Sequence, residues 1–172
     1  MNGERTALLD GTLASLHRTL EEVIQLQQQL VATLQEEKRV IVESDLARLT
    51  VCVSEKEALL NAIRQLEARW RTLVEPIARR FGLAEAVSLR QLIAVLAEPD
   101  RSQFQSCLER LSALRASMIE LNQVNRLLID KTLKKISELM EFLRHLSNNS
   151  QIYRATGTLS RQPATGRLLS RG

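Results

Sequence analysis

The first forty residues carry a heptad pattern of apolar positions. Seam positions follow alternating steps of three and four residues, at Leu9, Leu13, Leu16, Leu20, Val23, Leu30, Leu34 and Ile41, with Gln27 and Glu37 filling the two that remain. This spacing puts the side chains in one narrow stripe along a helix. Because no Gly or Pro lies between Thr12 and Val42, it predicts a helix of roughly 35–40 residues. We interpret Gln27 as a register-fixing or solvent-facing position.

The register then breaks between Ile41 and Leu46, a step of five residues. Ser44 and Asp45 lie inside this step, and both residue types are common helix N-caps. The break predicts a tight turn followed by a second helix, with a single bent helix as the alternative.

The second helix is expected from about Asp45 to Arg80. Its apolar face is wider than a two-stranded seam, which indicates packing against more than one neighbour. Pro76 removes a backbone donor, so we expect a kink or an early end near Glu75. Gly82 is expected to end the helix.

Two further helices follow. Ser88-Leu89-Arg90-Gln91 has the form of a capping box and predicts a short helix over Leu89–Ala97, ended by Glu98-Pro99-Asp100. The last helix is expected from Asp100 or Ser102 to about Ser147. Its stripe is polar in the middle, at Asn125 and Thr132, and strongly apolar again after Ile136.

These elements predict an all-α fold: an elongated antiparallel helical bundle, or coiled-coil hairpin, of three long helices and one short helix. The bundle domain is expected over residues 1–147. Residues 148–172 contain Gly, Pro, Ser and Thr and no acidic residue, which predicts a flexible basic tail, disordered in isolation.

Amino-acid composition limits the classes of binding site and partner that the chain can have. The chain is 44% hydrophobic but only 3% aromatic, which favours helix–helix packing over an aromatic-lined ligand pocket. The net charge of +4 comes from four arginines in the tail, so the neutral bundle argues against a nucleic-acid-binding domain. The basic tail alone could contact an acidic partner, a membrane surface or RNA.

Catalytic chemistry is not indicated by the residues. The two histidines, His17 and His145, fall at polar helical positions, and the two cysteines, Cys52 and Cys107, form no Cys/His ligand motif. We therefore predict no enzyme activity, no metal and no cofactor. No signal peptide or membrane-spanning segment is recognisable, so we expect a cytoplasmic protein without membrane insertion.

Two surfaces are candidates for binding. The first is the apolar strip of the last helix, flanked by lysines and interrupted by Asn122 and Asn125; it is either core or a surface for another helix. Its candidate contact residues are Leu128, Ile136, Leu139, Leu143 and Leu146. The second is the tail, where Tyr153 is either incidental or the anchor of a short linear motif.

Four sequence elements occur in a recognisable order. They are the turn at Ser44-Asp45-Leu46, the run EKEALL at 55–60, the run LNQVNRLL at 121–128, and a Tyr-x-x-x-Gly element at 153–157. Together they resemble the FlgN family of flagellar export chaperones. The tail departs from that family at Arg154 and continues for fifteen residues beyond Gly157.

The resemblance implies a cytoplasmic chaperone, monomeric or homodimeric. Such a chaperone binds hook–filament junction proteins, prevents their premature assembly and delivers them to the type III export gate. It implies client binding by Leu128, Ile136, Leu139, Leu143 and Leu146, polar motif positions at Asn122 and Asn125, and gate docking by Tyr153 and Gly157. The main alternative is a structural coiled-coil protein that self-associates or tethers other components, against which the polar breaks and Pro76 weigh. RNA binding through the tail is a third possibility.

Overall fold

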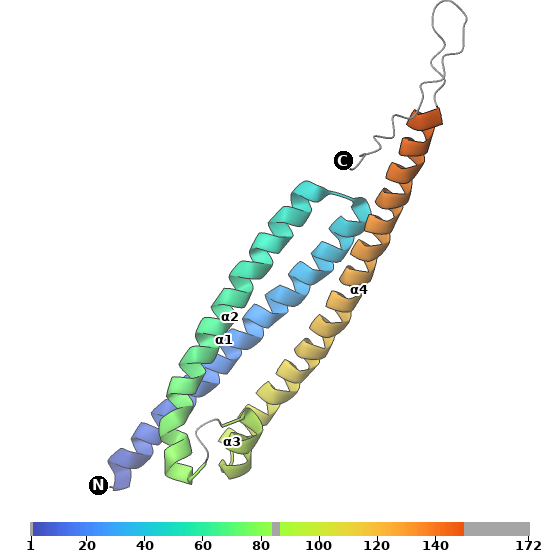
Figure 1. The fold of residues 1–172 in the computed structure, drawn as a ribbon. Coiled ribbons are helices and arrows are strands. Elements are labelled where there is room, and N and C mark those ends of the chain that lie inside the picture. The colour runs from blue at the N-terminus through green and yellow to red at the C-terminus, as the bar shows by residue number, and fades with distance from the viewer. Residues whose placement is uncertain (1, 84–86, 150–172) are drawn as a thin grey trace, which may run out of the picture. The chain divides into compact units, whose positions relative to one another are not determined.

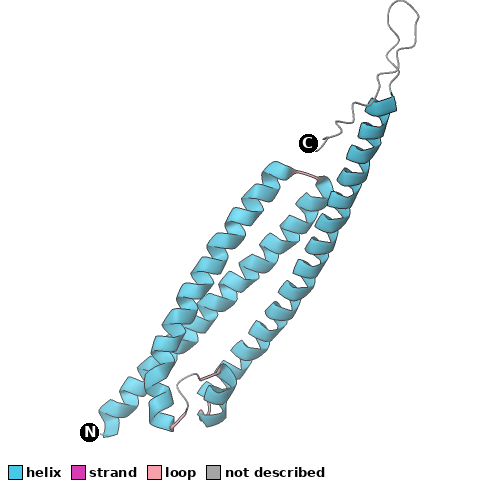
Figure 2. Ribbon diagram, viewed as in Figure 1, coloured by secondary structure: helices cyan, strands magenta, loops and turns pink. Residues whose placement is uncertain are grey.

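The computed structural model describes the backbone of residues 2–83 and 87–149 and the side chains of residues 10–83 and 87–146. Over this part of the chain it contains four helices and no strand (Figure 2). They are α1 (Asn2–Glu43), α2 (Leu46–Phe81), α3 (Leu89–Val95) and α4 (Asp100–Asn149), labelled in Figure 1. The predicted all-α class, with three long helices and a short one, is confirmed.

The chain divides into two compact units inside α4, Met1–Ile129 and Asp130–Gly172, which we describe separately. The first contains α1, α2, α3 and the first part of α4. The predicted boundary between a bundle and a tail at residues 147 and 148 stays a prediction, since residues 150–172 lie outside the described part of the chain.

The break in register near Ile41 is a tight turn, which decides against a single bent helix. Ser44 has a φ of 58°, and its backbone N–H donates to the carbonyl of Ile41 at 3.2 Å. The carboxylate of Asp45 accepts a hydrogen bond from the backbone N–H of Arg48 at 3.1 Å and so caps α2. α1 and α2 therefore form an antiparallel hairpin (Figure 1).

Pro76 does not end α2, so of the predicted kink or early end near Glu75, the early end is wrong. The helix continues to Phe81 because the residues around the proline are held in the core, namely Val74, Ile77 and Ala78, each at most 3% exposed. Their packing offsets the one backbone hydrogen bond that proline cannot donate. The predicted stop at Gly82 is confirmed: its φ is 64°, and the following N–H, of Leu83, donates to the carbonyl of Ala78.

The predicted capping box of α3 is confirmed. The Ser88 hydroxyl accepts from the backbone N–H of Gln91 at 3.3 Å, and the Gln91 side chain accepts from the backbone N–H of Ser88 at 2.9 Å. The helix ends at Val95, two residues before the predicted Ala97. The reason is Leu96, whose backbone turns to an extended conformation while its side chain is buried in the core.

The large core cluster of the first unit joins all four helices. Its buried members are Leu13, Leu16, Leu20, Ile24, Val74, Ile77, Ala78, Val87, Leu92, Ile93, Leu96, Phe104 and Cys107. A small core cluster further along α1 consists of Leu30, Leu34 and Ile63, with Met118 and Leu121 of α4 packed against it. The heptad stripe of α1 therefore supplies one side of both clusters, as the apolar spacing predicts.

Candidate functional site

A buried polar layer lies next to the small core cluster. The side chain of Asn125 on α4 donates to the backbone carbonyl of Leu34 at 3.0 Å and to a carboxylate oxygen of Glu37 at 2.9 Å. The other carboxylate oxygen of Glu37 accepts from the ammonium group of Lys56 on α2. Glu37 is 5% exposed and Asn125 is 3% exposed, so three helices meet through a desolvated network.

The polar positions in the apolar stripes differ in how far their side chains are hydrogen-bonded. Asn125 Oδ1 has no hydrogen-bond partner in the described residues, and the same holds for Gln27 Oε1 nearer the start of α1. Asn122, the other polar motif position, lies on the exposed side and donates to the carbonyl of Met118. Of the two family-motif asparagines, only Asn125 therefore contributes to the interior.

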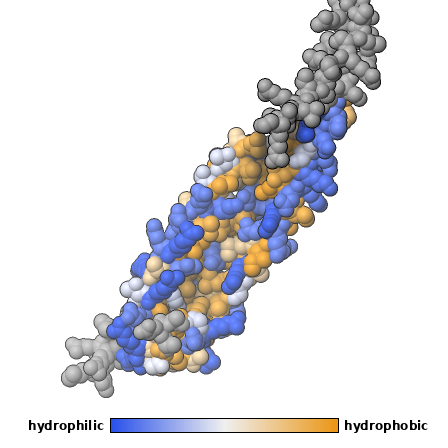
Figure 3. Space-filling view, viewed as in Figure 1, coloured by the Kyte–Doolittle hydropathy of each residue, from blue (hydrophilic) through white to orange (hydrophobic). Residues whose placement is uncertain are grey.

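A second feature is the apolar surface on α4 beyond Ile129. Seven large apolar side chains there are 50–59% exposed: Leu133, Ile136, Leu139, Met140, Phe142, Leu143 and Leu146. Four of the five predicted contact residues belong to this set, whereas Leu128, in the first unit, is partly buried. We call these seven residues the α4 apolar face. Figure 3 shows apolar side chains reaching the surface between polar ones on one face of the molecule.

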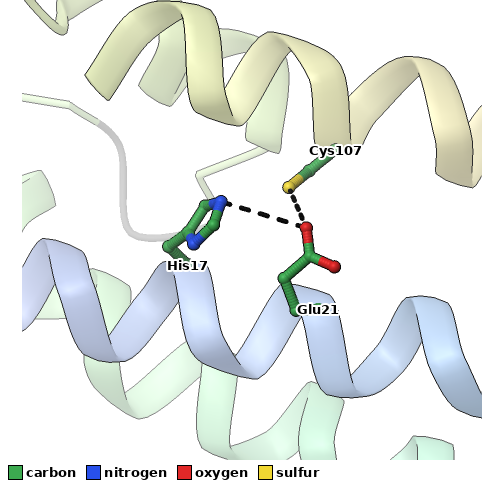
Figure 4. A group of neighbouring side chains, drawn as sticks. All are labelled: His17, Glu21 and Cys107. Carbon is green, nitrogen blue, oxygen red and sulfur yellow. Dashed lines mark hydrogen bonds and ion pairs between the residues drawn. The ribbon is translucent and has the colours of Figure 1, made fainter. Parts of the chain in front are cut away.

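A third feature brings together residues far apart in the sequence. His17 and Glu21 lie one turn apart on α1 and face Cys107 on α4 (Figure 4). One carboxylate oxygen of Glu21 accepts from Arg110 at 2.6 Å and from the Cys107 thiol at 3.5 Å, and His17 Nε2 lies 4.0 Å from it. The imidazole also packs edge-on against Phe104, with ring centroids 5.8 Å apart. The sequence shows no sign of this cluster, because Cys107 lies 86 residues after Glu21 in the chain.

The electrostatics of this cluster follow from its contacts. The hydrogen bond from Arg110 is the main reason that the pKa of Glu21 lies below its ordinary value. Burial raises the pKa of Cys107 to about 11, with help from the neighbouring Glu21 carboxylate. Burial also raises the pKa of Cys52. Both thiols are therefore protonated at neutral pH, and neither is an activated nucleophile.

One of the remaining predicted positions lies on α4, and two lie outside the described residues. His145 is exposed on α4, where its Nε2 lies 3.9 Å from a carboxylate oxygen of Glu141. Tyr153 and Gly157 lie outside the described residues. None of the helices in the described chain is both long and apolar enough to cross a membrane.

The fold defines an all-helical protein that carries large exposed apolar side chains on its last helix. A family model, described as FlgN protein, matches residues 5–161, which is nearly the whole chain. The chain belongs to the FlgN family, a family of cytosolic, non-enzymatic flagellar export chaperones. Membership implies binding of hook-associated proteins. The search of curated proteins gave no match, and neither did the search of solved structures.

Proposed function

We propose that this chaperone binds hook–filament junction proteins through the α4 apolar face, keeps them from assembling prematurely and delivers them to the flagellar export gate. The observation that carries this proposal is a run of seven large apolar side chains, each at least half exposed, within fourteen residues of one helix. An uncovered apolar surface of this kind on a helix is typical of a protein-binding site.

The arrangement of side chains around α4 supports a helix-binding surface. At 3.6 residues per turn, the α4 apolar face covers about half of the helical circumference. The opposite half carries charged and polar side chains, including Lys131, Lys134, Glu138, Glu141 and Arg144. Lys135 lies inside the apolar half, near its edge, so an amphipathic client helix would find an apolar strip with one lysine in it and a charged border.

The exposed area suits reversible binding. Fully burying a large aliphatic or aromatic side chain stabilises a complex by about 1.5–3 kcal/mol, so covering the exposed half of each contributes about 1 kcal/mol. Seven such contributions are largely offset by the translational and rotational freedom that the two partners lose on binding. The net affinity should therefore be moderate, as the handover of a client to the export gate requires.

Replacing both Leu139 and Leu143 with Asp tests the proposal. The double variant loses about 2 kcal/mol of apolar contact and must also desolvate two carboxylates, so affinity for purified hook–filament junction proteins should fall at least about 100-fold. Helicity should hardly change, since both side chains are half exposed. Titration calorimetry and far-ultraviolet circular dichroism measure the two effects.

A matched control is available on α2. Leu46 and Val51 are 76% and 56% exposed, so replacing both with Asp introduces the same charges at two exposed apolar positions of another helix. Full client affinity in this control, with loss in the α4 variant, supports the proposal. Unchanged affinity in the α4 variant contradicts it, and concentration-dependent oligomers without client binding would favour a self-associating coiled-coil protein.

Delivery to the export gate is proposed to use the tail, through Tyr153 and Gly157, on the strength of the family resemblance. A chain ending at Ser147 should bind junction proteins with normal affinity but fail to capture purified export-gate components. Tyr153→Ala in the full chain should reproduce that failure. Capture of the gate by both variants would remove the tail from the mechanism.

A further inference from the structure

The cluster of His17, Glu21 and Cys107 has the composition of a metal site. Its three side chains offer an imidazole nitrogen, a carboxylate oxygen and a sulfur, and these atoms all lie within 4.8 Å of one another. His17 and Glu21 are four residues apart on α1, the spacing at which two helical side chains face the same point. Cys107 reaches that point from α4 (Figure 4).

The distances leave room for one cation. Glu21 Oε1 lies 3.5 Å from Cys107 Sγ and 4.0 Å from His17 Nε2. The remaining distance, between the ligand atoms of His17 and Cys107, is at most 4.8 Å. A point equidistant from the three atoms therefore lies about 2.4 Å from each, whereas zinc lies about 2.0–2.3 Å from its ligands. Rotamer adjustments of a few tenths of an ångström would close that difference.

We propose that His17, Glu21 and Cys107 form a three-residue binding site for a Zn²⁺-like divalent cation that joins α1 to α4. Nitrogen, oxygen and sulfur ligands together favour zinc over the hard cations Mg²⁺ and Ca²⁺, which take oxygen. Three protein ligands leave a fourth position for water. A solvent-open hollow of about 680 Å³, lined by His17, Glu21, Asp10 and Asp100, gives access from outside.

Two local changes accompany binding. The Cys107 thiol releases its proton to solvent as the sulfur–metal bond forms, because the thiolate is the ligand. Arg110, which donates to the same Glu21 oxygen, has to shift to the other carboxylate oxygen. From there it holds the liganding carboxylate in place, as hydrogen-bond partners of metal ligands commonly do.

The cation is expected to stabilise the first unit by linking two of its helices. Cys107 and Phe104 belong to the large core cluster, so the cation would tie α4 to α1 at the solvent-facing edge of that packing. A ligand that binds only the folded state lowers the unfolding equilibrium constant about 100-fold when its free concentration is 100 times its Kd.

The test uses the full chain, stripped with a chelator and titrated with Zn²⁺, Co²⁺ or Mg²⁺. We expect one Zn²⁺ per chain, a higher Tm with Zn²⁺ but not with Mg²⁺, and a sulfur-to-metal charge-transfer band with Co²⁺. Cys107→Ala should abolish the band, and His17→Gln should weaken Zn²⁺ binding at least about tenfold. The histidine variant keeps the test valid if the buried cysteine variant is unstable.

Matched controls exist for both ligand types. Cys52→Ala removes the other buried thiol. His145→Gln removes the other histidine that lies one turn from a glutamate, and no cysteine of the described residues joins that pair in a set of metal ligands. Both should bind Zn²⁺ as the unaltered chain does. Normal Zn²⁺ binding by His17→Gln and by Cys107→Ala, or loss of the cobalt band in Cys52→Ala, would overturn the proposal.

Discussion

Replacing Lys56 with Met removes the ammonium group that pairs with the buried carboxylate of Glu37. The side chain of Glu37 is 6% exposed and that of Lys56 is 26% exposed. Removing one partner of a fully buried ion pair costs about 3–5 kcal/mol, because the other charge stays desolvated and uncompensated. Since Lys56 keeps some contact with solvent, we expect a loss of about 2–3 kcal/mol in the free energy of unfolding.

A second change should recover most of that loss. In the double variant Lys56→Met, Glu37→Met no charge remains in the polar layer, so the desolvation penalty disappears. Asn125 keeps its hydrogen bond to the carbonyl of Leu34. The double variant should therefore be more stable than Lys56→Met alone, although it carries one more substitution.

Chemical denaturation measures both variants. Trp70, the only tryptophan, packs against the large core cluster and reports unfolding by fluorescence, alongside far-ultraviolet circular dichroism. Arg79→Met is the control, because Arg79 pairs with Glu75 while 76% exposed and its loss should change stability by less than about 0.5 kcal/mol. The reasoning is refuted if Lys56→Met is no more destabilising than this control, or if the double variant is the least stable of the three.

Three further predictions follow from single contacts. Ser44→Gly should stabilise the chain by about 1 kcal/mol, since Ser44 holds a left-handed φ of 58° that Gly adopts freely, as thermal denaturation can show. Glu36→Gln should lower stability at neutral pH. Arg39, and then Arg48, depress the pKa of Glu36 in the folded state. The stability that the Glu36 carboxylate contributes is therefore present above the ordinary pKa of 4.5 and disappears as pH falls through the depressed pKa. Iodoacetamide should label Cys107 far more slowly in the folded chain than in denaturant, because the thiol is buried and its pKa is about 11; equal rates would contradict this.

The helices were predictable because their signals are local. A heptad stripe, a cap at Asp45, a capping box at Ser88 and a glycine stop at Gly82 each depend on residues within one or two turns. The early end near Glu75 was wrong because Pro76 is tolerated through burial of its neighbours, which is a tertiary effect. The end of α3 was missed for the same reason, since the burial of Leu96 outweighs local helix preference.

The candidate sites were predictable only in part. The apolar residues of α4 follow from periodicity, but their exposure is a tertiary property, and Leu133, Met140 and Phe142 were not singled out. The polar positions Glu37 and Asn125 were visible as breaks in two separate stripes. Their pairing depends on the register between α1 and α4, which no local pattern specifies. The proximity of His17 to Cys107 depends on the same register between α1 and α4.

The buried polar layer provides that register. If α4 moved along α1 by one helical turn, about 5.4 Å, Asn125 would lose both of its bonds and Glu37 would lose its amide donor. Apolar seams alone tolerate such a slip, because leucine packs against leucine in either position, whereas a desolvated carboxylate does not. Fixing this register determines which α4 side chains belong to the core.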